Sequence, residues 1–169
     1  PEYATEKVVD MGTRGMDTCW TIMSEQAVEI LGYSFKDKRL LNKALTHASI
    51  AGHRLESNER MEFLGDAILG YIVCEYLFQE FPNLHEGEMT KIKSSVVSRR
   101  VCAKISEKIN LNSMLSLGKG MISQRVLPSN VSAAVLEAIV TAIYLDGGID
   151  SLSVLCHYII TLRECSDAP

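Results

Sequence analysis

Between residues 58 and 69 the chain reads NERMEFLGDAIL, which places three carboxylates in a stretch that becomes strongly apolar. Side chains three and seven residues apart lie on one stripe of an α-helix, so Glu59, Glu62 and Asp66 are expected to project together. The following residues, 67–74, are almost wholly apolar, which is typical of a core helix. Like charges beside a core require a compensating proton or cation, and a divalent metal ion is the simplest such cation.

The same acids also have a simpler explanation. Glu59 and Glu62 fall in the first turn and a half of the expected helix, where the helix dipole favours acidic side chains whatever the function. Asp66 lies deeper in the helix, and the dipole explains it poorly. The spacing alone therefore leaves open both a metal site and a purely electrostatic role.

Apolar periodicity on either side of this stretch predicts an all-α single domain. Asn58 is expected to cap a helix that runs to about Phe81, where Pro82 stops it. Its apolar middle suggests a central helix wrapped by others. The other expected helices cover residues 24–31, 37–47, 88–109, 131–145 and 150–162. No stretch alternates with the period of a strand.

Size and composition fit one domain with a substantial core, since hydrophobic residues make up 47% of the 169 residues. We expect a flexible extension over residues 1–20, the domain over 21–165 and a tail over 166–169. No apolar run reaches the eighteen or so residues that span a bilayer, and no secretory signal is visible. The five cysteines form no CxxC pair, which favours a reducing compartment. These features predict a cytoplasmic protein without a membrane partner.

Charge is distributed unevenly along the chain. The net charge of −4 by itself argues against a nucleic-acid partner. However, residues 56–88 hold eight acids against one base, and residues 91–119 hold seven bases against one acid. This segregation is compatible with an acidic reaction centre beside a surface that attracts phosphates. Two solvated helix faces of opposite charge would give the same pattern.

Glu137 is the only acid in the apolar segment 131–145. It either points to solvent, which is common, or has a partner. If its helix packs against the one that carries Glu62 and Asp66, the three carboxylates can meet. Ligation by oxygen alone, with several waters, suits Mg²⁺ or Mn²⁺, and such a metal can activate water and stabilise a phosphodiester in reaction. The four histidines are scattered, and each is expected to be a surface or satisfied residue.

Taken together, these stretches resemble the ribonuclease III family. Residues 58–69 are nearly the family's diagnostic motif. Supporting stretches are LTHAS at 45–49, FP at 81–82, EGEMT at 86–90, LGKG at 117–120, LEA at 136–138 and AIYLDGG at 142–148. The resemblance covers roughly residues 24–162, the length of an endonuclease domain.

The resemblance implies a helical homodimer that cuts double-stranded RNA with Mg²⁺, for which Mn²⁺ substitutes. The products would carry 5′-phosphate and 3′-hydroxyl ends with a short 3′ overhang. Carried over by position, the catalytic and metal-binding carboxylates are Glu62, Asp66 and Glu137. Glu59 and Glu86 match accessory acidic positions. Phe63 matches an aromatic residue that inserts into the partner subunit, so the dimer interface is expected beside the catalytic helix.

The sequence departs from the family pattern in two places. The family carries an Asp three residues before the catalytic Glu of its second helix, and here that position is Ala134. Three carboxylates can still hold one Mg²⁺ with waters, so we expect a site that is slow or needs much metal. The chain also ends where a double-stranded-RNA-binding domain would begin, and RNA binding without it is expected to be weaker and more salt-sensitive.

We therefore expect a dimeric endonuclease that processes double-stranded precursors of ribosomal or messenger RNA. The candidate contacts to the RNA backbone are Lys91, Lys93, Arg99, Arg100, Lys104 and Lys108. The alternative is a catalytically impaired ribonuclease III-like RNA-binding dimer, which Ala134 favours. A protein-interaction module that uses the dimer face is a third possibility, but it leaves the clustered carboxylates unexplained.

Overall fold

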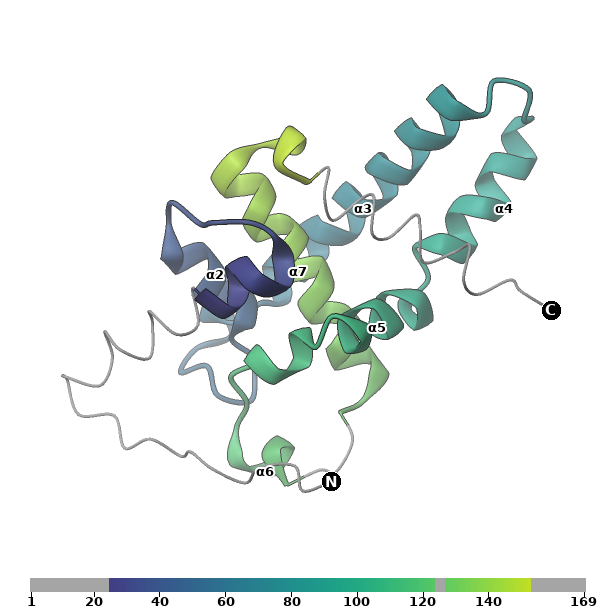
Figure 1. The fold of residues 1–169 in the computed structure, drawn as a ribbon. Helices are drawn as coiled ribbons and strands as arrows, with labels where there is room; N and C mark the ends of the chain where they lie inside the picture. Colours follow the sequence, from purple (N-terminus) through teal and green to yellow (C-terminus); the bar gives the residue numbers. More distant parts are fainter. Residues whose placement is uncertain (1–24, 124–126, 153–169) are drawn as a thin grey trace.

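The computed structural model describes residues 25–123 and 127–152, and this part of the chain is helical, as predicted (Figure 1). Helix α7 (Ser129–Gly147) runs through the middle, and every residue from Val131 to Ile143 is buried. This burial follows from composition, because Glu137 is the only charged residue in that segment. Helices α3 (Glu59–Glu80), α5 (Arg99–Lys108) and α2 (Lys38–Leu45) make the most extensive contacts with α7.

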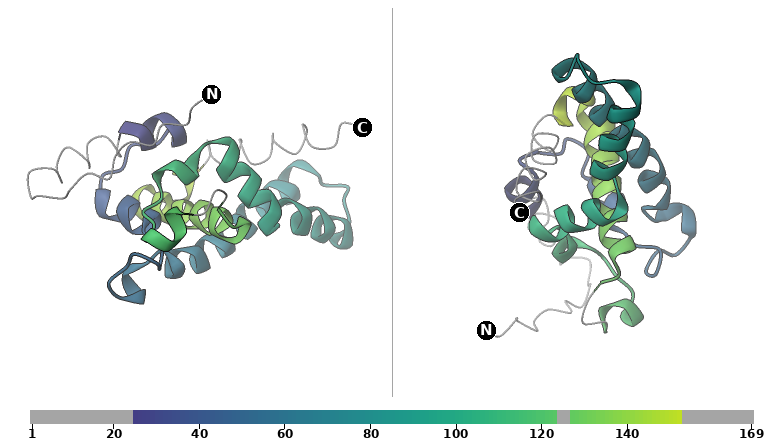
Figure 2. Two further views of the ribbon diagram at one scale, coloured as in Figure 1. Left: turned by 90° about the horizontal axis from the view of Figure 1, so that it is seen from below. Right: turned by 90° about the vertical axis from the view of Figure 1, so that its right-hand side faces the viewer.

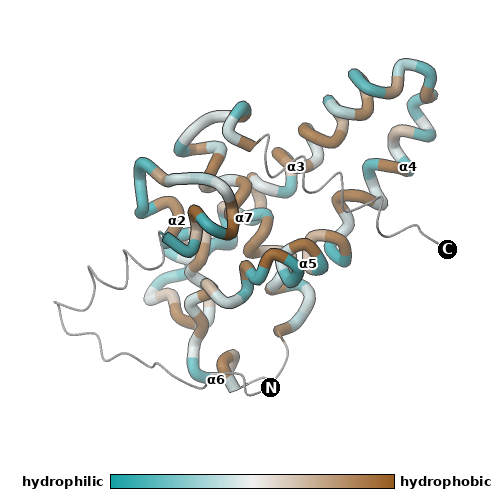
Figure 3. The backbone as a smooth tube through the Cα atoms, viewed as in Figure 1, coloured by the Kyte–Doolittle hydropathy of each residue, from teal (hydrophilic) through white to brown (hydrophobic). Residues whose placement is uncertain are grey.

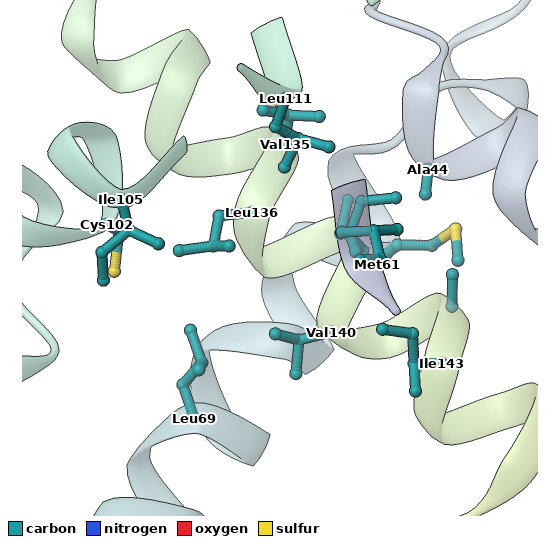
Figure 4. Close-up of a cluster of buried hydrophobic side chains, with 14 of the residues drawn as sticks. Ala44, Met61, Leu69, Cys102, Ile105, Leu111, Val135, Leu136, Val140 and Ile143 are labelled. Atoms are coloured by element: carbon teal, nitrogen blue, oxygen red, sulfur yellow. The ribbon is translucent and has the colours of Figure 1, made fainter. Parts of the chain in front are cut away.

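The core lies where α3 and α5 pack on α7. In Figure 4, Leu136 of α7 lies toward Cys102 and Ile105 of α5, and Val140 lies toward Leu69 of α3. Each of these side chains is at most 3% exposed. Burial, and next the charge of nearby carboxylates, raises the pKa of the Cys102 thiol to about 12. This thiol therefore stays protonated and packs as a small apolar group.

Helices α3 and α7 cross in direct backbone contact. A Cβ atom added to Gly65 would collide with the carbonyl group of Glu137 and would lie 3.0 Å from its Cα. Next to this crossing, the Thr141 hydroxyl donates a 2.7 Å hydrogen bond to the Met61 carbonyl. The absence of a side chain at Gly65 thus allows the acidic end of α3 to lie against the middle of α7.

The single helix expected over residues 88–109 is wrong, because the structure has two helices there. Helix α4 (Glu86–Val96) is followed by the C-cap residue Val97, and Ser98 adopts an extended backbone before α5 begins. Apolar spacing continues on both sides of the break, so periodicity alone could not reveal it. The break has a clear consequence: α4 runs back beside the far half of α3 as a projecting hairpin, while α5 returns to α7 (Figures 1 and 2).

Helix α3 is not wrapped on all sides, contrary to the expectation of a central helix. One face packs on the core through residues such as Leu69, Val73 and Leu77. The other face exposes large apolar side chains, with Phe63 83% exposed and Phe78 76% exposed. Figure 3 shows hydrophobic residues recurring along the helix out to its tip. A monomer rarely leaves such a continuous apolar face uncovered.

Two of the expected helix starts are placed correctly, with different capping. The Asp37 carboxylate accepts a hydrogen bond from the Arg39 amide and caps α2, as predicted. Asn58 does precede α3, but its side chain makes no capping hydrogen bond. Instead its amide group donates to the buried carbonyl of Ala44 and ties α2 to α3.

Helix α2 ends at Leu45, two residues earlier than expected. Thr46 has an extended backbone and forms an isolated parallel bridge with Ser116. No strand occurs among residues 25–123 and 127–152. His47 consequently lies in a turn between two segments rather than on a helix.

The remaining elements are short: η1 (Arg54–Glu56), η2 (Leu111–Met114), α6 (Lys119–Ile122) and η3 (Ile149–Leu152). Residues 25–31 are also helical and end at Gly32, as predicted, with a φ of 64°. The helix expected over 150–162 begins as η3, and its remainder lies outside the described residues. The extension over 1–20 and the tail over 166–169 lie outside them as well.

The end of α7 is tied to the N-terminal part of the domain by one carboxylate. Asp146 accepts hydrogen bonds of 2.8 Å from the Tyr33 hydroxyl and from the amides of Lys36 and Asp37. Burial raises the pKa of Asp146, but these donors outweigh it and the net pKa is lowered. The Asp146 carboxylate therefore holds the C-terminal end of α7 against the segment that precedes α2.

Helix α7 also satisfies the length and composition of a membrane span. The sequence expectation concerned uninterrupted apolar runs, and this helix is interrupted by Glu137 and Asp146. However, 72% of the relevant window is buried inside the domain, as expected of a core helix in a globular fold.

Candidate active site

A cavity of about 620 Å³ opens beside the N-terminal half of α3. It is lined by Glu59, Glu62, Phe63, Asp66, Ala67, Val97, Arg99 and Glu137. The acids of α3 share this cavity because their spacing puts them on one side of the helix. Glu137 joins them because α7 crosses α3 at Gly65. The structure thus brings together the three carboxylates that the sequence put forward as catalytic.

Glu137 is the most perturbed carboxyl group of the cavity. Its residue is 6% exposed. Burial first, and then the charges of Glu62 and Asp66, raise the pKa of Glu137 to about 7, while Arg99 acts in the opposite direction. Burial also raises the pKa of Glu62, with Arg99 again opposing and the neighbouring acids adding to the rise. Mutual repulsion of this kind is what a bound cation would relieve.

The donor set fits a hard divalent cation. All the candidate ligands are carboxylate oxygens, which Mg²⁺ and Mn²⁺ prefer, whereas Zn²⁺ would require His or Cys. Across residues 25–123 and 127–152, no three acidic, histidine or cysteine side chains converge into a ready metal cluster. Glu62, Asp66 and Glu137 thus line one cavity but do not form a closed set of metal ligands, so a cation there would need water to complete its coordination.

Arg99 belongs to this cavity, which the sequence did not indicate. It was grouped with the bases of the segment 91–108, and the break at Ser98 places it at the start of α5, facing the acids. Its positive charge opposes the rise in the pKa values of Glu62 and Glu137. A serine before a run of helix formers is a recognised N-cap signal and could have revealed the break.

The two accessory acids lie in different places. Glu59 lines the cavity, and Arg54 donates three hydrogen bonds of 2.8, 2.9 and 3.3 Å to its carboxylate. This pairing lowers the pKa of Glu59. Glu86 begins α4 and accepts a hydrogen bond from Thr90 in a separate groove between α3 and α4. Within one chain the structure does not bring Glu86 to the carboxylate cavity.

The other predicted RNA contacts are dispersed. Lys93 is half-buried and lines the groove between α3 and α4. The remaining four bases are exposed on α4 and α5: Lys91, Arg100, Lys104 and Lys108. Their contact with RNA stays a prediction.

Ala134 lies one turn before Glu137 on α7 and is 8% exposed. Its methyl group offers no ligand. Glu137 is consequently the single carboxylate that α7 contributes to the cavity. The carboxylate that the sequence lacks at position 134 is therefore not supplied by another residue of α7.

His47 was expected to be a surface or satisfied residue, and the structure agrees, because it is half-buried and its Nδ1 accepts a hydrogen bond from the Ser49 amide. The sequence did not indicate that it lies near Glu59 and Glu62, where a positive charge on the ring would act to lower both pKa values. The signal that could have found it is the pairing of LTHAS at 45–49 with LGKG at 117–120, because Ser49 and Gly118 hydrogen-bond to each other.

The family profile described as Ribonuclease-III-like matches residues 37–162, about three quarters of the chain. The chain belongs to the ribonuclease III-like family.

Curated relatives agree with this family assignment. The chain is 54% identical over 124 residues to Ribonuclease 3 of Rhodopirellula baltica, covering 73% of this chain and 47% of that protein. It is 41% identical over 133 residues to Ribonuclease 3 of Bartonella henselae, covering 77% and 56%. The chain spans about half the length of these curated relatives, so the match concerns one part of each.

Solved structures identify which part. The nuclease domain of ribonuclease III from Campylobacter jejuni is 34% identical to this chain, with a TM-score of 0.75 over 81% of this chain and 96% of that one. That Campylobacter domain shows structural flexibility in a region involved in dimer formation. Dicer from Pichia stipitis shares the fold at 24% identity, with a TM-score of 0.54 over 78% of this chain and 56% of that one. The described residues thus correspond to a ribonuclease III nuclease domain.

Proposed function

We propose that this chain is the nuclease domain of an endonuclease that cleaves double-stranded RNA with Mg²⁺, for which Mn²⁺ can substitute. The observation that carries the proposal is the meeting of Glu62, Asp66 and Glu137 in one cavity. The products would be 5′-phosphate and 3′-hydroxyl ends, in the processing of RNA precursors in the cytoplasm.

Each carboxylate has its own part in this proposal. Glu62, Asp66 and Glu137 would hold the cation, which supplies an activated water and stabilises charge on the phosphodiester when bound. Glu137 must first lose its proton, because only the ionised carboxylate is a good ligand. Glu62 shares the cavity wall and is subject to the same requirement. Arg54 keeps Glu59 oriented at the rim.

The test is cleavage of a perfect RNA duplex by the purified chain with Mg²⁺ or Mn²⁺. We expect cleavage by the wild type and at least a roughly 100-fold loss for Glu137→Gln, which removes a charged ligand while keeping the side-chain volume. Glu107→Gln is the matched control, since Glu107 is an exposed acid on α5. Intact RNA at every metal concentration, with a folded protein, would remove the proposal.

A second candidate function has one specific observation in its favour. Ala134 leaves α7 with a single carboxylate in the cavity. The chain could then be a catalytically impaired RNA-binding dimer that retains the scaffold.

Restoring the carboxylate by Ala134→Asp distinguishes the two candidates. For an impaired enzyme we expect a gain of about tenfold or more in apparent metal affinity or cleavage rate. Asn130→Asp is the matched control, because it adds a carboxylate to the exposed first turn of α7. An unchanged rate for Ala134→Asp, from a wild type that already cleaves, would mean that three carboxylates suffice.

Self-association forms part of the proposed function. We place the dimer face on the exposed side of α3, where Phe63 and Phe78 are the most exposed large apolar residues of the described segments. This face begins at the carboxylate cavity, because Phe63 lines that cavity as well. The position agrees with the resemblance, which assigns Phe63 to the partner contact.

A further inference from the structure

The turn that follows α2 is fixed from two sides. The Thr46 carbonyl accepts a 2.9 Å hydrogen bond from the Asn58 amide, immediately before α3. The His47 amide donates a 3.1 Å hydrogen bond to the Ser116 carbonyl. His47 is therefore held between the first turn of the acidic helix and the segment that leads into α6.

The imidazole ring of His47 is held in one orientation. The Ser49 amide donates to Nδ1 at 3.1 Å, and the Ser49 hydroxyl lies 2.9 Å from the same atom. An atom that accepts from an amide carries no proton, so the ring proton is on Nε2. The Gly118 amide in turn donates to the Ser49 hydroxyl oxygen at 2.9 Å.

The glycine in this chain of hydrogen bonds is required by space. A Cβ atom at Gly118 would lie 2.5 Å from the Ser49 carbonyl oxygen. Any larger residue would push the two segments apart and release the hydroxyl that orients the ring. The segments LTHAS (45–49) and LGKG (117–120) thus together fix the orientation of the His47 ring.

The outer edge of the ring is free to meet a ligand. Within the described part of the chain no hydrogen bond to Nε2 of His47 is formed, whereas Nδ1 is engaged twice. The residue before His47 is hydrogen-bonded to Asn58, so the ring lies beside the first turn of α3, whose Glu59 and Glu62 line the carboxylate cavity. An N–H donor beside these acids is suited to an anion that must approach them, because it offsets part of their repulsion.

We propose that His47 is a catalytic residue that donates a hydrogen bond from Nε2 to a phosphate oxygen of the bound RNA, beside the carboxylate cavity. The inference rests on the proposed function, since it takes RNA as the substrate. Its basis is the locked ring, the unengaged Nε2 and the position of His47 at the start of α3.

Two substitutions separate the roles of the two ring nitrogens. His47→Asn keeps an acceptor near the Nδ1 position and removes the outer donor. His47→Gln carries an amide N–H near the Nε2 position and removes the contact with Ser49. We measure kcat and KM on an RNA duplex. We also measure duplex binding with each substitution in the Glu137→Gln background, where cleavage does not interfere.

The proposal predicts that His47→Asn weakens duplex binding and raises KM by about tenfold, the cost of one lost hydrogen bond to a charged group, at an unchanged melting temperature. His47→Gln should retain most of the binding. His53→Asn is the matched control: His53 also accepts a hydrogen bond from a backbone amide at Nδ1, but it is exposed at the N-cap of η1. This control should behave as the wild type.

The opposite pattern, with His47→Gln impaired and His47→Asn normal, would make the histidine a structural residue and overturn the proposal. Equal behaviour of the two variants would overturn it too. The binding measurement does not depend on cleavage. A wild type that binds RNA without cutting it therefore ends the proposed nuclease function while still testing His47.

Discussion

At the scale of single residues, burial of the Glu137 carboxyl group determines its protonation and its effect on stability. Glu137 lies in the most buried helix and shares its cavity with two other carboxylates, so its proton is retained up to a pKa of about 7. A carboxyl group that prefers its neutral form in the folded state makes the fold less stable as pH rises. The clustered carboxylates therefore lower the stability of the metal-free protein once Glu137 is ionised.

This reasoning predicts a pH dependence of stability in the presence of a chelator. The contribution of Glu137 to the free energy of unfolding is fully present below its unfolded pKa of 4.5. It is lost as pH rises through its folded pKa of about 7. From pH 5 to pH 8 the wild type should lose up to about 3 kcal/mol relative to Glu137→Gln. Urea unfolding at both pH values measures the difference. Glu107→Gln should follow the wild type, and a parallel course for Glu137→Gln would contradict the assignment.

Asp146 shows the opposite electrostatic arrangement, because its charge is satisfied by three donors. Asp146→Asn turns an amide toward some of these donors and should cost about 2 kcal/mol at neutral pH. The lowered pKa means that this stability is present above 3.8 and is lost as pH falls through the folded pKa, so the difference should shrink in acid. Thermal unfolding at neutral and acidic pH measures this difference in stability. Asp150→Asn, at an exposed residue, is the control and should leave the stability unchanged.

At the scale of elements, the α3–α7 crossing positions the site. The two backbones touch at Gly65, and the acids of α3 reach Glu137 only because no side chain separates the helices there. The length and type of both helices follow from their apolar runs. The crossing point does not, since it depends on which small residue happens to face the neighbouring helix.

Two glycines of the same helix provide a matched test. Gly65→Ala forces α3 away from α7 and should cost on the order of 3 kcal/mol, together with a loss of metal affinity as the carboxylates separate. At Gly70→Ala the added Cβ would meet only the flexible Lys93 side chain, at 3.4 Å. That variant should be neutral or up to about 1 kcal/mol more stable. Equal stability of the two variants in chemical unfolding would refute the close crossing.

At the scale of the whole molecule, three hollows follow the exposed side of α3. The carboxylate cavity shares Ala67 with a neighbouring cavity of about 820 Å³, which in turn shares Tyr71 with the groove between α3 and α4. The apolar face therefore extends from the candidate active site to the tip of the hairpin. A second copy of the chain on this face would cover it and would bring further side chains close to the site.

Phe63→Asp should consequently convert a dimer into a monomer that remains folded, because a charged group replaces the most exposed aromatic ring of the described residues. Sedimentation and circular dichroism measure the two properties. Val28→Asp is the control: Val28 is 44% exposed in the segment 25–31, on the side of the domain opposite α3 (Figure 2). A wild type that is monomeric at all concentrations would rule out this role for the face.

The amino-acid sequence by itself determined the helical class, most helix positions, the family resemblance and the shared stripe of Glu59, Glu62 and Asp66. These features depend on neighbours within a few turns of chain, which periodicity and caps report directly. The tertiary structure alone decided the crossing of α3 and α7 at Gly65, the entry of Arg99 into the cavity and the locked ring of His47. It also decided that one side of α3 is exposed. Each of these depends on contacts between segments far apart in the chain, and a local pattern carries no record of which segments meet.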